Sequence, residues 1–204
     1  MKSKFLFLLI ISFGLLHAQT GNEFLKKIQN KFKSVSDFSA DFSQFVTEPE
    51  GKQGTKISGK FYYKRKNKFI VELKNGKIIS NGETVWNYDV RQKRVVISNF
   101  SDDPTSFSIE RYVFDYPSEC EVNLVKSDNG KDDYIELVPK RGDLDFNSAK
   151  IWKNSDDLII RMEIEDISDY KYSIILNNIN TDSKLSDDKF NFNPPKGIKI
   201  IDLR

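Results

Sequence analysis

The sequence predicts a mainly β (α+β) domain built on an antiparallel sheet that is strongly curved or closed into a barrel. Three observations predict this class. Many short segments alternate apolar and polar residues with a period of two, Asn-Gly dipeptides typical of hairpins stand between some of them, and helical periodicity is limited to two short stretches. Short strands joined by such turns are typical of antiparallel sheets that curve or close on themselves.

We expect residues 1–18 to be a secretory signal peptide that is not part of the fold. Lys2 and Lys4 form a positively charged start, and the apolar run over residues 5–16 is too short to span a bilayer comfortably. Ala18 supplies a small residue at the expected cleavage point. A retained N-terminal anchor is the alternative. Because no linker or internal repeat follows, residues 19–204 are predicted to form a single domain.

The first expected element is an amphipathic helix that begins at Thr20. Thr20 and Glu23 have the spacing of a capping box, in which each side chain binds the other residue's backbone N–H. The apolar residues of the helix lie on one stripe at helical period: Phe24, Leu25, Ile28, Phe32 and Val35. Such a short helix is stabilised mainly by what its apolar face contacts, so we expect it to cover part of the sheet.

Strand periodicity begins after Ser36. Apolar residues then recur at every second position, as in Phe38, Ala40 and Phe42. The strands expected from this pattern lie near 38–43, 57–64, 69–73, 77–81, 84–90, 93–98, 120–127, 132–139, 146–153, 157–167 and 170–180. Asn-Gly dipeptides at 75–76, 81–82 and 129–130 predict tight hairpins between some of them.

A second helix is expected between these strands. Asp103 and Pro104 form an N-cap and first-turn pair, and Pro117 is expected to end the helix. Its apolar residues occur around much of the circumference: Phe107, Ile109, Tyr112, Val113 and Phe114. A helix of this kind needs cover on more than one side, or a ligand.

Several kinds of chemistry are excluded by what the sequence lacks. The single histidine, His17, lies in the predicted signal peptide, which excludes Ser-His-Asp and Cys-His catalysis and disfavours zinc and copper sites. Cys120 is the single cysteine and is expected to be a small buried hydrophobe. No Gly-rich phosphate motif occurs, and 32 Lys and Arg against 30 Asp and Glu leave no basic excess for nucleic acid.

The position of Arg65 allows two interpretations. Counting by twos, Arg65 is in phase with Phe61 and Phe69, so an unbroken strand would point its guanidinium to the apolar face. A cation there needs acceptors, and carbonyls at a helix C-terminus would serve. In the alternative, residues 64–68 form a charged turn with Arg65 in water. The residues alone leave both interpretations open, and also leave open whether the sheet interior is filled or hollow.

Four motifs give the chain a resemblance to a known family. In order along the sequence they are Phe38-Ser39-Ala40-Asp41-Phe42-Ser43-Gln44, then Gly59, Phe61, Lys64, Arg65, Asn67 and Phe69, then residues 81–89 (NGETVWNYD), then residues 190–198 (FNFNPPKGI). Together they resemble the LolA family, the periplasmic carriers of outer-membrane lipoproteins. The match is weakest over residues 99–125.

This resemblance implies a fold and a function. The fold is a half-closed antiparallel β-barrel covered by a helical lid, and its hydrophobic cavity takes the acyl chains of lipoproteins. The protein would be a non-enzymatic periplasmic chaperone without cofactor or metal, expected to act as a monomer. Its implied partners are acylated lipoproteins, an inner-membrane ABC transporter that releases them, and an outer-membrane acceptor.

The resemblance also implies roles for individual residues. The arginine that latches the lid falls on Arg65, and its partner is a backbone carbonyl near Phe32. Lys66 stands where the family usually has proline, and Val71 stands where some members have tryptophan. The expected residues of the lipid-binding cavity are Phe38, Phe42, Phe61, Tyr63, Phe69, Val71, Leu73, Trp86, Phe107 and Phe114.

Three other functions compete with the carrier. An outer-membrane acceptor of the same fold would need a lipidated cysteine after the signal peptide, and residues 12–24 contain none. A hydrolase that uses two carboxylates would need acidic residues on the cavity face, where the predicted inward positions are almost all apolar. A sensor domain of related shape usually comes with a second domain, for which we expect no room.

Overall fold

The computed structural model describes residues 20–101, 108–128, 132–181 and 183–204. The predicted signal peptide therefore lies outside the described residues. The same holds for the predicted N-cap pair Asp103-Pro104, for Phe107, and for the third Asn-Gly dipeptide at 129–130.

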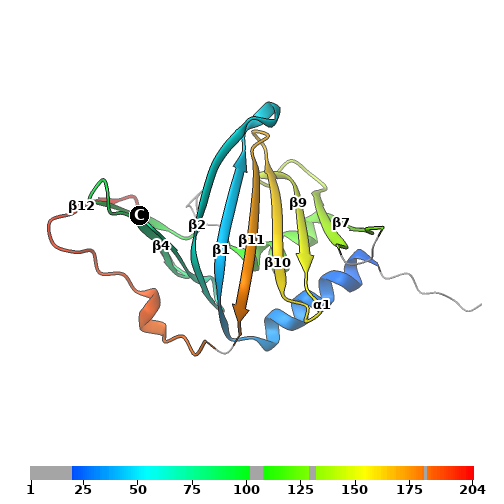
Figure 1. Ribbon diagram of the computed structural model, residues 1–204, viewed down its shortest axis with the longest axis horizontal. Coiled ribbons are helices and arrows are strands. Elements are labelled where there is room, and N and C mark those ends of the chain that lie inside the picture. Colours follow the sequence, from blue (N-terminus) through cyan, green and yellow to red (C-terminus); the bar gives the residue numbers. More distant parts are fainter. Residues whose placement is uncertain (1–19, 102–107, 129–131, 182) are drawn as a thin grey trace, which may run out of the picture.

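The predicted first helix is present as α1 (Gly21–Ser34), with the predicted capping box. Thr20 Oγ1 accepts a hydrogen bond from Glu23 N at 3.2 Å, and Glu23 Oε2 accepts one from Thr20 N at 2.9 Å. The helix packs through its apolar face against β7 (Cys120–Val125), β8 (Tyr134–Pro139) and the short helix η2 (Arg111–Asp115) (Figure 1). Gly21 allows a close approach, since a Cβ there would lie 2.3 Å from the carbonyl oxygen of Val122 in β7.

The strands form one sheet in the described part of the chain (Figure 1). Their spatial order is β12-β6-β5-β4-β3-β2-β1-β11-β10-β9-β8-β7. The bounds are β1 (Asp37–Thr47), β2 (Gln53–Lys64), β3 (Lys68–Leu73), β4 (Gly76–Asn81), β5 (Thr84–Asp89), β6 (Arg94–Asn99), β7 (Cys120–Val125), β8 (Tyr134–Pro139), β9 (Phe146–Lys153), β10 (Ile159–Asp166), β11 (Lys171–Asn180) and β12 (Lys199–Asp202). The predicted mainly β fold and each of the eleven predicted strands are thereby confirmed.

Strand β12 (Lys199–Asp202) was not predicted, and it corrects the expectation of a purely antiparallel sheet because it pairs with β6 in parallel. Its four residues show no alternation. They form a strand through tertiary contacts, since Lys199 N donates to Lys93 O and Leu203 N donates to Ile97 O, each at 2.8 Å.

The described residues also form four short helices: η1 (Pro49–Gly51), η2 (Arg111–Asp115), η3 (Tyr116–Glu119) and η4 (Asp187–Phe190). The predicted second helix corresponds to residues 109–119, where a π-helical turn passes into a 3₁₀ turn. Pro117 does not end it, contrary to expectation. Proline fits there because it lies in the first turn of η3, where a backbone N–H has no helical partner. We call residues 108–119 the lid segment.

The first Asn-Gly dipeptide is displaced from its expected place at the tip of a hairpin. Leu73 pairs with Gly76, so the β3–β4 turn consists of Lys74 and Asn75, and Gly76 opens β4. Glycine is needed at this strand position because a Cβ would lie 2.3 Å from the carbonyl oxygen of Tyr88. The second dipeptide is also displaced by one residue, since Asn81 ends β4 and the β4–β5 turn consists of Gly82, with a φ of 95°, and Glu83.

The main core lies on one face of the sheet, which we call the inner face, beneath α1 and the lid segment. A smaller cluster lies on the opposite, outer face, where Ile70 and Ile79 pack against the fully buried Phe190 of η4. Residues 183–198, which we call the C-terminal segment, thus pass along the outer face before the chain enters β12 (Figure 1).

Candidate functional site

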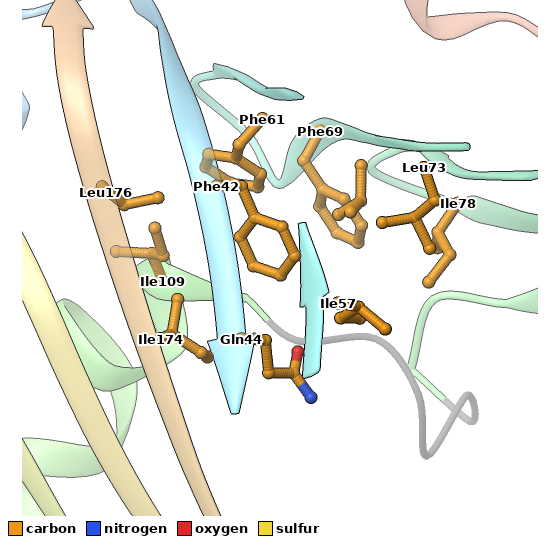
Figure 2. A pocket seen from close by; sticks show the side chains of 11 residues that line it. Phe42, Gln44, Ile57, Phe61, Phe69, Leu73, Ile78, Ile109, Ile174 and Leu176 are labelled. Carbon is orange, nitrogen blue, oxygen red and sulfur yellow. The ribbon is translucent and has the colours of Figure 1, made fainter. Parts of the chain in front are cut away.

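An apolar cavity of about 70 Å³ lies between the inner face and the lid segment (Figure 2). Strands β1 to β4 and β11 supply most of its wall, and Ile109 contributes from the lid segment. The lining residues are Phe42, Gln44, Ile57, Phe61, Phe69, Val71, Leu73, Ile78, Ile109, Ile174 and Leu176. Gln44 adds a polar amide to an otherwise apolar wall.

The sheet register explains why space remains at this point. Gly59 lies between Phe42 of β1 and Leu73 of β3, on the inner side, so no side chain fills the gap between these two. A larger residue is excluded there, because a Cβ at Gly59 would lie 1.8 Å from the carbonyl oxygen of Glu72.

The predicted cavity residues separate into several groups. Phe42, Phe61, Phe69, Val71 and Leu73 line the cavity. Phe38 and Tyr63 are buried beside it, with ring centroids 4.9 Å apart, and both pack against Phe32 of α1. Phe114 packs against the main core from the lid segment. The period-two alternation therefore assigned most of these side chains to the inner face correctly. A side chain lines the cavity only if it also lies at the level of the cavity along its strand.

Trp86 is the exception, since the prediction that it lies in the cavity is wrong. It pairs with Ile79 in the sheet and belongs to the outer-face cluster with Phe190, whereas its neighbour Val85 points to the inner core. Apolar residues stand at both the odd and the even positions of β5, so alternation could not show which of them point to the inner face.

Arg65 lies in the turn between β2 and β3. Lys64 pairs with Lys68, so the turn consists of Arg65, Lys66 and Asn67, and the last two have φ angles of 70° and 56°. The Arg65 side chain is exposed and forms no hydrogen bond or ion pair with any residue that the structure describes. The charged-turn interpretation is therefore the one that the structure shows. The expected hydrogen bonds to a carbonyl near Phe32 are not formed, because the chain reverses before Arg65 can point inward.

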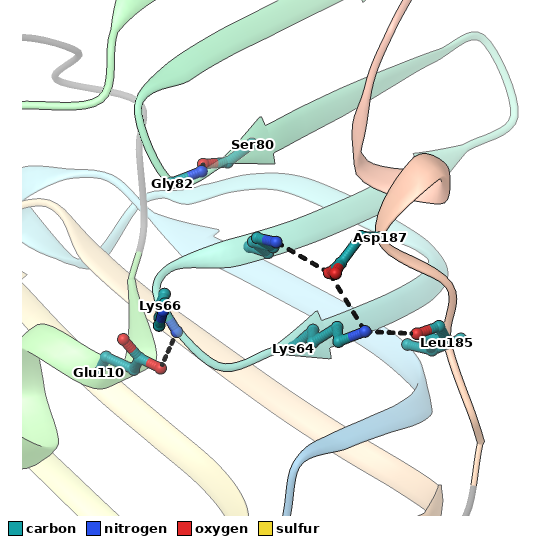
Figure 3. Close-up of polar contacts among 8 residues, drawn as sticks. Lys64, Lys66, Ser80, Gly82, Glu110, Leu185 and Asp187 are labelled. Atoms are coloured by element: carbon teal, nitrogen blue, oxygen red, sulfur yellow. Dashed lines mark hydrogen bonds and ion pairs between the residues drawn. The ribbon is translucent and has the colours of Figure 1, made fainter.

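A different residue connects this turn to the lid segment. Glu110 Oε1 receives a hydrogen bond of 3.0 Å from Lys66 N (Figure 3). Its Oε2 receives one of the same length from Asn67 N. The Tyr63 hydroxyl also donates to Glu110 Oε1. Burial, together with the hydrogen bond and the negative charge of Glu110, raises the pKa of Tyr63, so its hydroxyl stays protonated as a donor. Ser108 reinforces the contact by donating to Asn67 Oδ1 at 2.6 Å.

Two further contacts hold the lid segment, one with α1 and one with Phe100. Gln29 of α1 donates through Nε2 to the carbonyl oxygen of Val113 at 2.8 Å. Arg111 donates to the carbonyl oxygen of Phe100 at 3.2 Å, and its guanidinium lies 4.5 Å from the centre of the Phe100 ring. The lid segment is thus fixed over the cavity by polar contacts at its edges.

The C-terminal segment holds the same hairpin from the outer face. Asp187 forms ion pairs with Lys64 at 3.1 Å and Lys68 at 2.8 Å, and Lys64 also donates to the carbonyl oxygen of Leu185 at 2.7 Å (Figure 3). The β2–β3 hairpin is therefore held by contacts on the outer face that do not involve the lid segment.

Comparison with known proteins decides the family. Residues 33–193 match the sequence model of the outer membrane lipoprotein carrier protein LolA. The chain belongs to the LolA family. It is 24% identical over 203 residues to an outer-membrane lipoprotein carrier protein of Nitrosomonas europaea, with 98% of each chain covered. It is 28% identical over 181 residues to one of Actinobacillus succinogenes, covering 87% of this chain and 85% of the relative.

Solved structures agree with the fold. An uncharacterized conserved protein from Thermus thermophilus superposes with a TM-score of 0.55 at 14% identity, over 89% of this chain and 98% of that one. At this identity the likeness concerns the fold alone. Membership of the LolA family confirms the resemblance, the lipoprotein-carrier class and the expectation that the protein is not an enzyme.

Several features of this LolA-family site were not predicted from its sequence. Ile174 and Leu176 line the cavity from β11, and their alternation in the predicted strand 170–180 was available as a signal. Glu110 carried no signal, because nothing near it in sequence indicates the turn that it binds. Cys120 is buried in the main core, as predicted, and burial raises the pKa of its thiol.

The described ranges contain no group of three or more His, Cys, Asp or Glu side chains that could hold a metal ion. None of their helices is long and apolar enough to cross a membrane.

Proposed function

We propose that this LolA-family protein carries lipoproteins across the periplasm, with their acyl chains held in the cavity of Figure 2. It would receive them from an inner-membrane ABC transporter and deliver them to an outer-membrane acceptor. The observation that carries the proposal is the apolar cavity on the inner face, covered by a lid segment that polar contacts hold in place. Export would use residues 1–18 as a cleaved signal peptide, and the carrier would act as a monomer without a cofactor.

The energetics of acyl chains explain why a carrier is needed. Each buried methylene contributes about 0.8 kcal/mol, so one sixteen-carbon chain contributes roughly 12 kcal/mol. A protein with several such chains leaves a membrane for water too slowly to be useful. A covered apolar cavity lowers this barrier, because the chains exchange one apolar surrounding for another.

The small size of the cavity indicates a closed state. About 70 Å³ is far below the 300–1,000 Å³ of typical ligand pockets, so an acyl chain requires the lid segment to move away. Opening costs free energy, and this cost lowers the apparent affinity for the chains and favours their release when the lid closes again.

We propose that the latch of this lid is the contact between Glu110 and the turn that carries Arg65. Its supporting contacts are the two hydrogen bonds from Lys66 and Asn67 and the one from Tyr63, which itself packs on Phe32. Arg65 and Phe32 thus belong to the latch region through their neighbours, and Glu110 supplies the polar contact.

Ligand competition tests the carrier function. Purified protein is titrated with an environment-sensitive apolar dye and with an acylated peptide, and transfer of the bound peptide to acceptor membranes is then followed. We expect both ligands to bind at one site with mutual competition, and the unacylated peptide to leave the dye in place. Absence of dye uptake and of competition would show that the inner face is a packed core without carrier function.

A further inference from the structure

The β2–β3 turn presents a pair of backbone N–H groups to a carboxylate. Lys66 and Asn67 both have left-handed backbone conformations, with φ angles of 70° and 56°, and this brings their N–H groups to one side of the turn. Each donates to a different oxygen of Glu110, at 3.0 Å in both cases. The hydroxyl of Tyr63 adds a third donor. The geometry is that of a carboxylate-binding site, and Glu110 occupies it.

These donors are held in place by contacts that do not involve Glu110. Arg65 N donates to the carbonyl oxygen of Ser36 at 3.1 Å, and Ser80 Oγ donates to the carbonyl oxygen of Asn67 at 2.9 Å. The Tyr63 ring is buried against Phe38. The three donors therefore keep their arrangement when the lid segment, and Glu110 with it, moves away.

The site lies at the edge of the apolar cavity. Ile109, the residue before Glu110, lines that cavity, and so does Phe69, two residues after Asn67. Arg65 adds an exposed guanidinium without a partner among the described residues. Burial raises the pKa of Tyr63, and Arg65 is close enough to oppose this rise through its charge. An anionic group bound to the three donors would thus have a cation beside it and an apolar cavity next to it.

We propose that Glu110 is an internal substitute for the carboxylate of a long-chain amphiphile. When the lid segment opens, the alkyl chain of a fatty acid enters the cavity and its carboxylate takes the place of Glu110 on Lys66 N–H, Asn67 N–H and Tyr63 OH, beside Arg65. A carboxylate is the chosen class because its two oxygens match two N–H groups with one oxygen each. The inference rests on the proposed function in one respect, since the cavity must accept an alkyl chain.

Paired ligands separate the anion site from the cavity. Dodecanoate and 1-dodecanol have the same chain and differ in the charged end, and their affinities are measured by displacement of the apolar dye. The variants are wild type, Glu110→Ala, Glu110→Gln and the control Asp115→Ala, which removes an exposed acid of the same lid segment. Opening the latch alone strengthens binding of both ligands equally, whereas vacating the anion site strengthens binding of dodecanoate alone.

We expect the preference for dodecanoate over 1-dodecanol to rise by about tenfold or more in Glu110→Ala, with no rise in Asp115→Ala. Adding Tyr63→Phe to Glu110→Ala should reverse part of that rise, because one donor is lost. In ¹⁵N spectra of Glu110→Ala, dodecanoate should shift the amide signals of Lys66 and Asn67, and 1-dodecanol should leave them in place. Glu110→Gln, which keeps the side-chain shape, provides the same comparison where Glu110→Ala folds poorly.

Two outcomes would overturn the inference in distinguishable ways. An equal gain for both ligands would make Glu110 a latch without an anion site, and the carrier function would stand. Failure of 1-dodecanol to bind any variant would remove the cavity function and the anion site together.

Discussion

The carboxylate of Glu110 accepts a 3.0 Å hydrogen bond from the backbone N–H of Asn67, which joins the lid segment to the β2–β3 turn across 43 residues of sequence. The resemblance implied the reverse arrangement, with a cation on the turn that donates to carbonyls of a helix. In this protein the turn donates through its backbone and the lid segment supplies the anion. In the latch that we propose, a helical cover is fastened to the same turn that the resemblance implied, and the roles of donor and acceptor are exchanged.

Replacing Glu110 should loosen the lid. Glu110→Gln removes the negative charge that receives three hydrogen bonds, and bonds to charged groups contribute about 1.5–3 kcal/mol each. Because the lid segment is half-exposed, we expect the free energy of unfolding to fall by about 2 kcal/mol. Binding of the apolar dye should become tighter, since opening costs less. Urea denaturation and dye titration measure the two effects, with Asp115→Asn as the control; unchanged values for both would show that Glu110 is not a latch.

Arg65 should contribute little to the stability of the closed protein. Its side chain is exposed and has no polar partner among the described residues, so Arg65→Leu should change the free energy of unfolding by less than about 0.5 kcal/mol. Arg65→Lys keeps the positive charge and serves as the control. A loss of more than about 1.5 kcal/mol, restored only in part by lysine, would mean that the guanidinium binds helix carbonyls in solution.

The two faces of the sheet should respond differently to substitution. Val71→Phe places a larger side chain in a cavity of about 70 Å³, so uptake of dye and acylated peptide should fall while the fold is kept. Trp86→Leu is the comparison on the outer face, where Trp86 packs with the Phe190 cluster. It should lower the free energy of unfolding by about 1–3 kcal/mol and leave ligand uptake unchanged. Reduced uptake in Trp86→Leu at temperatures where it is folded would place Trp86 in the cavity after all.

Two tyrosines, the buried Tyr63 and the half-buried Tyr112, should make the protein sensitive to alkali. Burial raises the pKa of Tyr63 and of Tyr112 above the ordinary value of tyrosine, so both stay neutral in the folded chain. The unfolded chain ionises them above a pH of about 10. The free energy of unfolding should therefore be unaffected below that pH and fall above it, by about 1.4 kcal/mol per pH unit for each tyrosine.

Absorbance of tyrosinate follows this titration directly. Two of the tyrosines should ionise only as the protein unfolds, and Tyr63→Phe should remove one of them. Ionisation of all tyrosines near pH 10 in the folded protein would contradict the positions of Tyr63 and Tyr112 in the core.

Local sequence patterns determined the elements and the family. The capping box at Thr20 and Glu23 and the period-two segments depend on neighbours a few residues apart, and both appear in the structure where the sequence placed them. The same alternation put Phe42, Phe61 and Phe69 on the inner face. The ordered motifs across the chain were sufficient to identify the LolA family. A motif can be recognised from its own residues, without knowledge of the residues that surround it in the fold.

Tertiary structure decided the features that depend on distant segments. In β5 both phases are apolar, so the side of Trp86 was set by Phe190, which arrives from more than 100 residues away and covers the outer face. Strand β12 has no pattern of its own and forms only because the edge of β6 is free to bind it. The place of Glu110 likewise depends on two positive φ angles in a turn far along the chain. Periodicity specifies which residues share a face of a strand. Which segment covers that face depends on tertiary packing between residues that are distant in sequence.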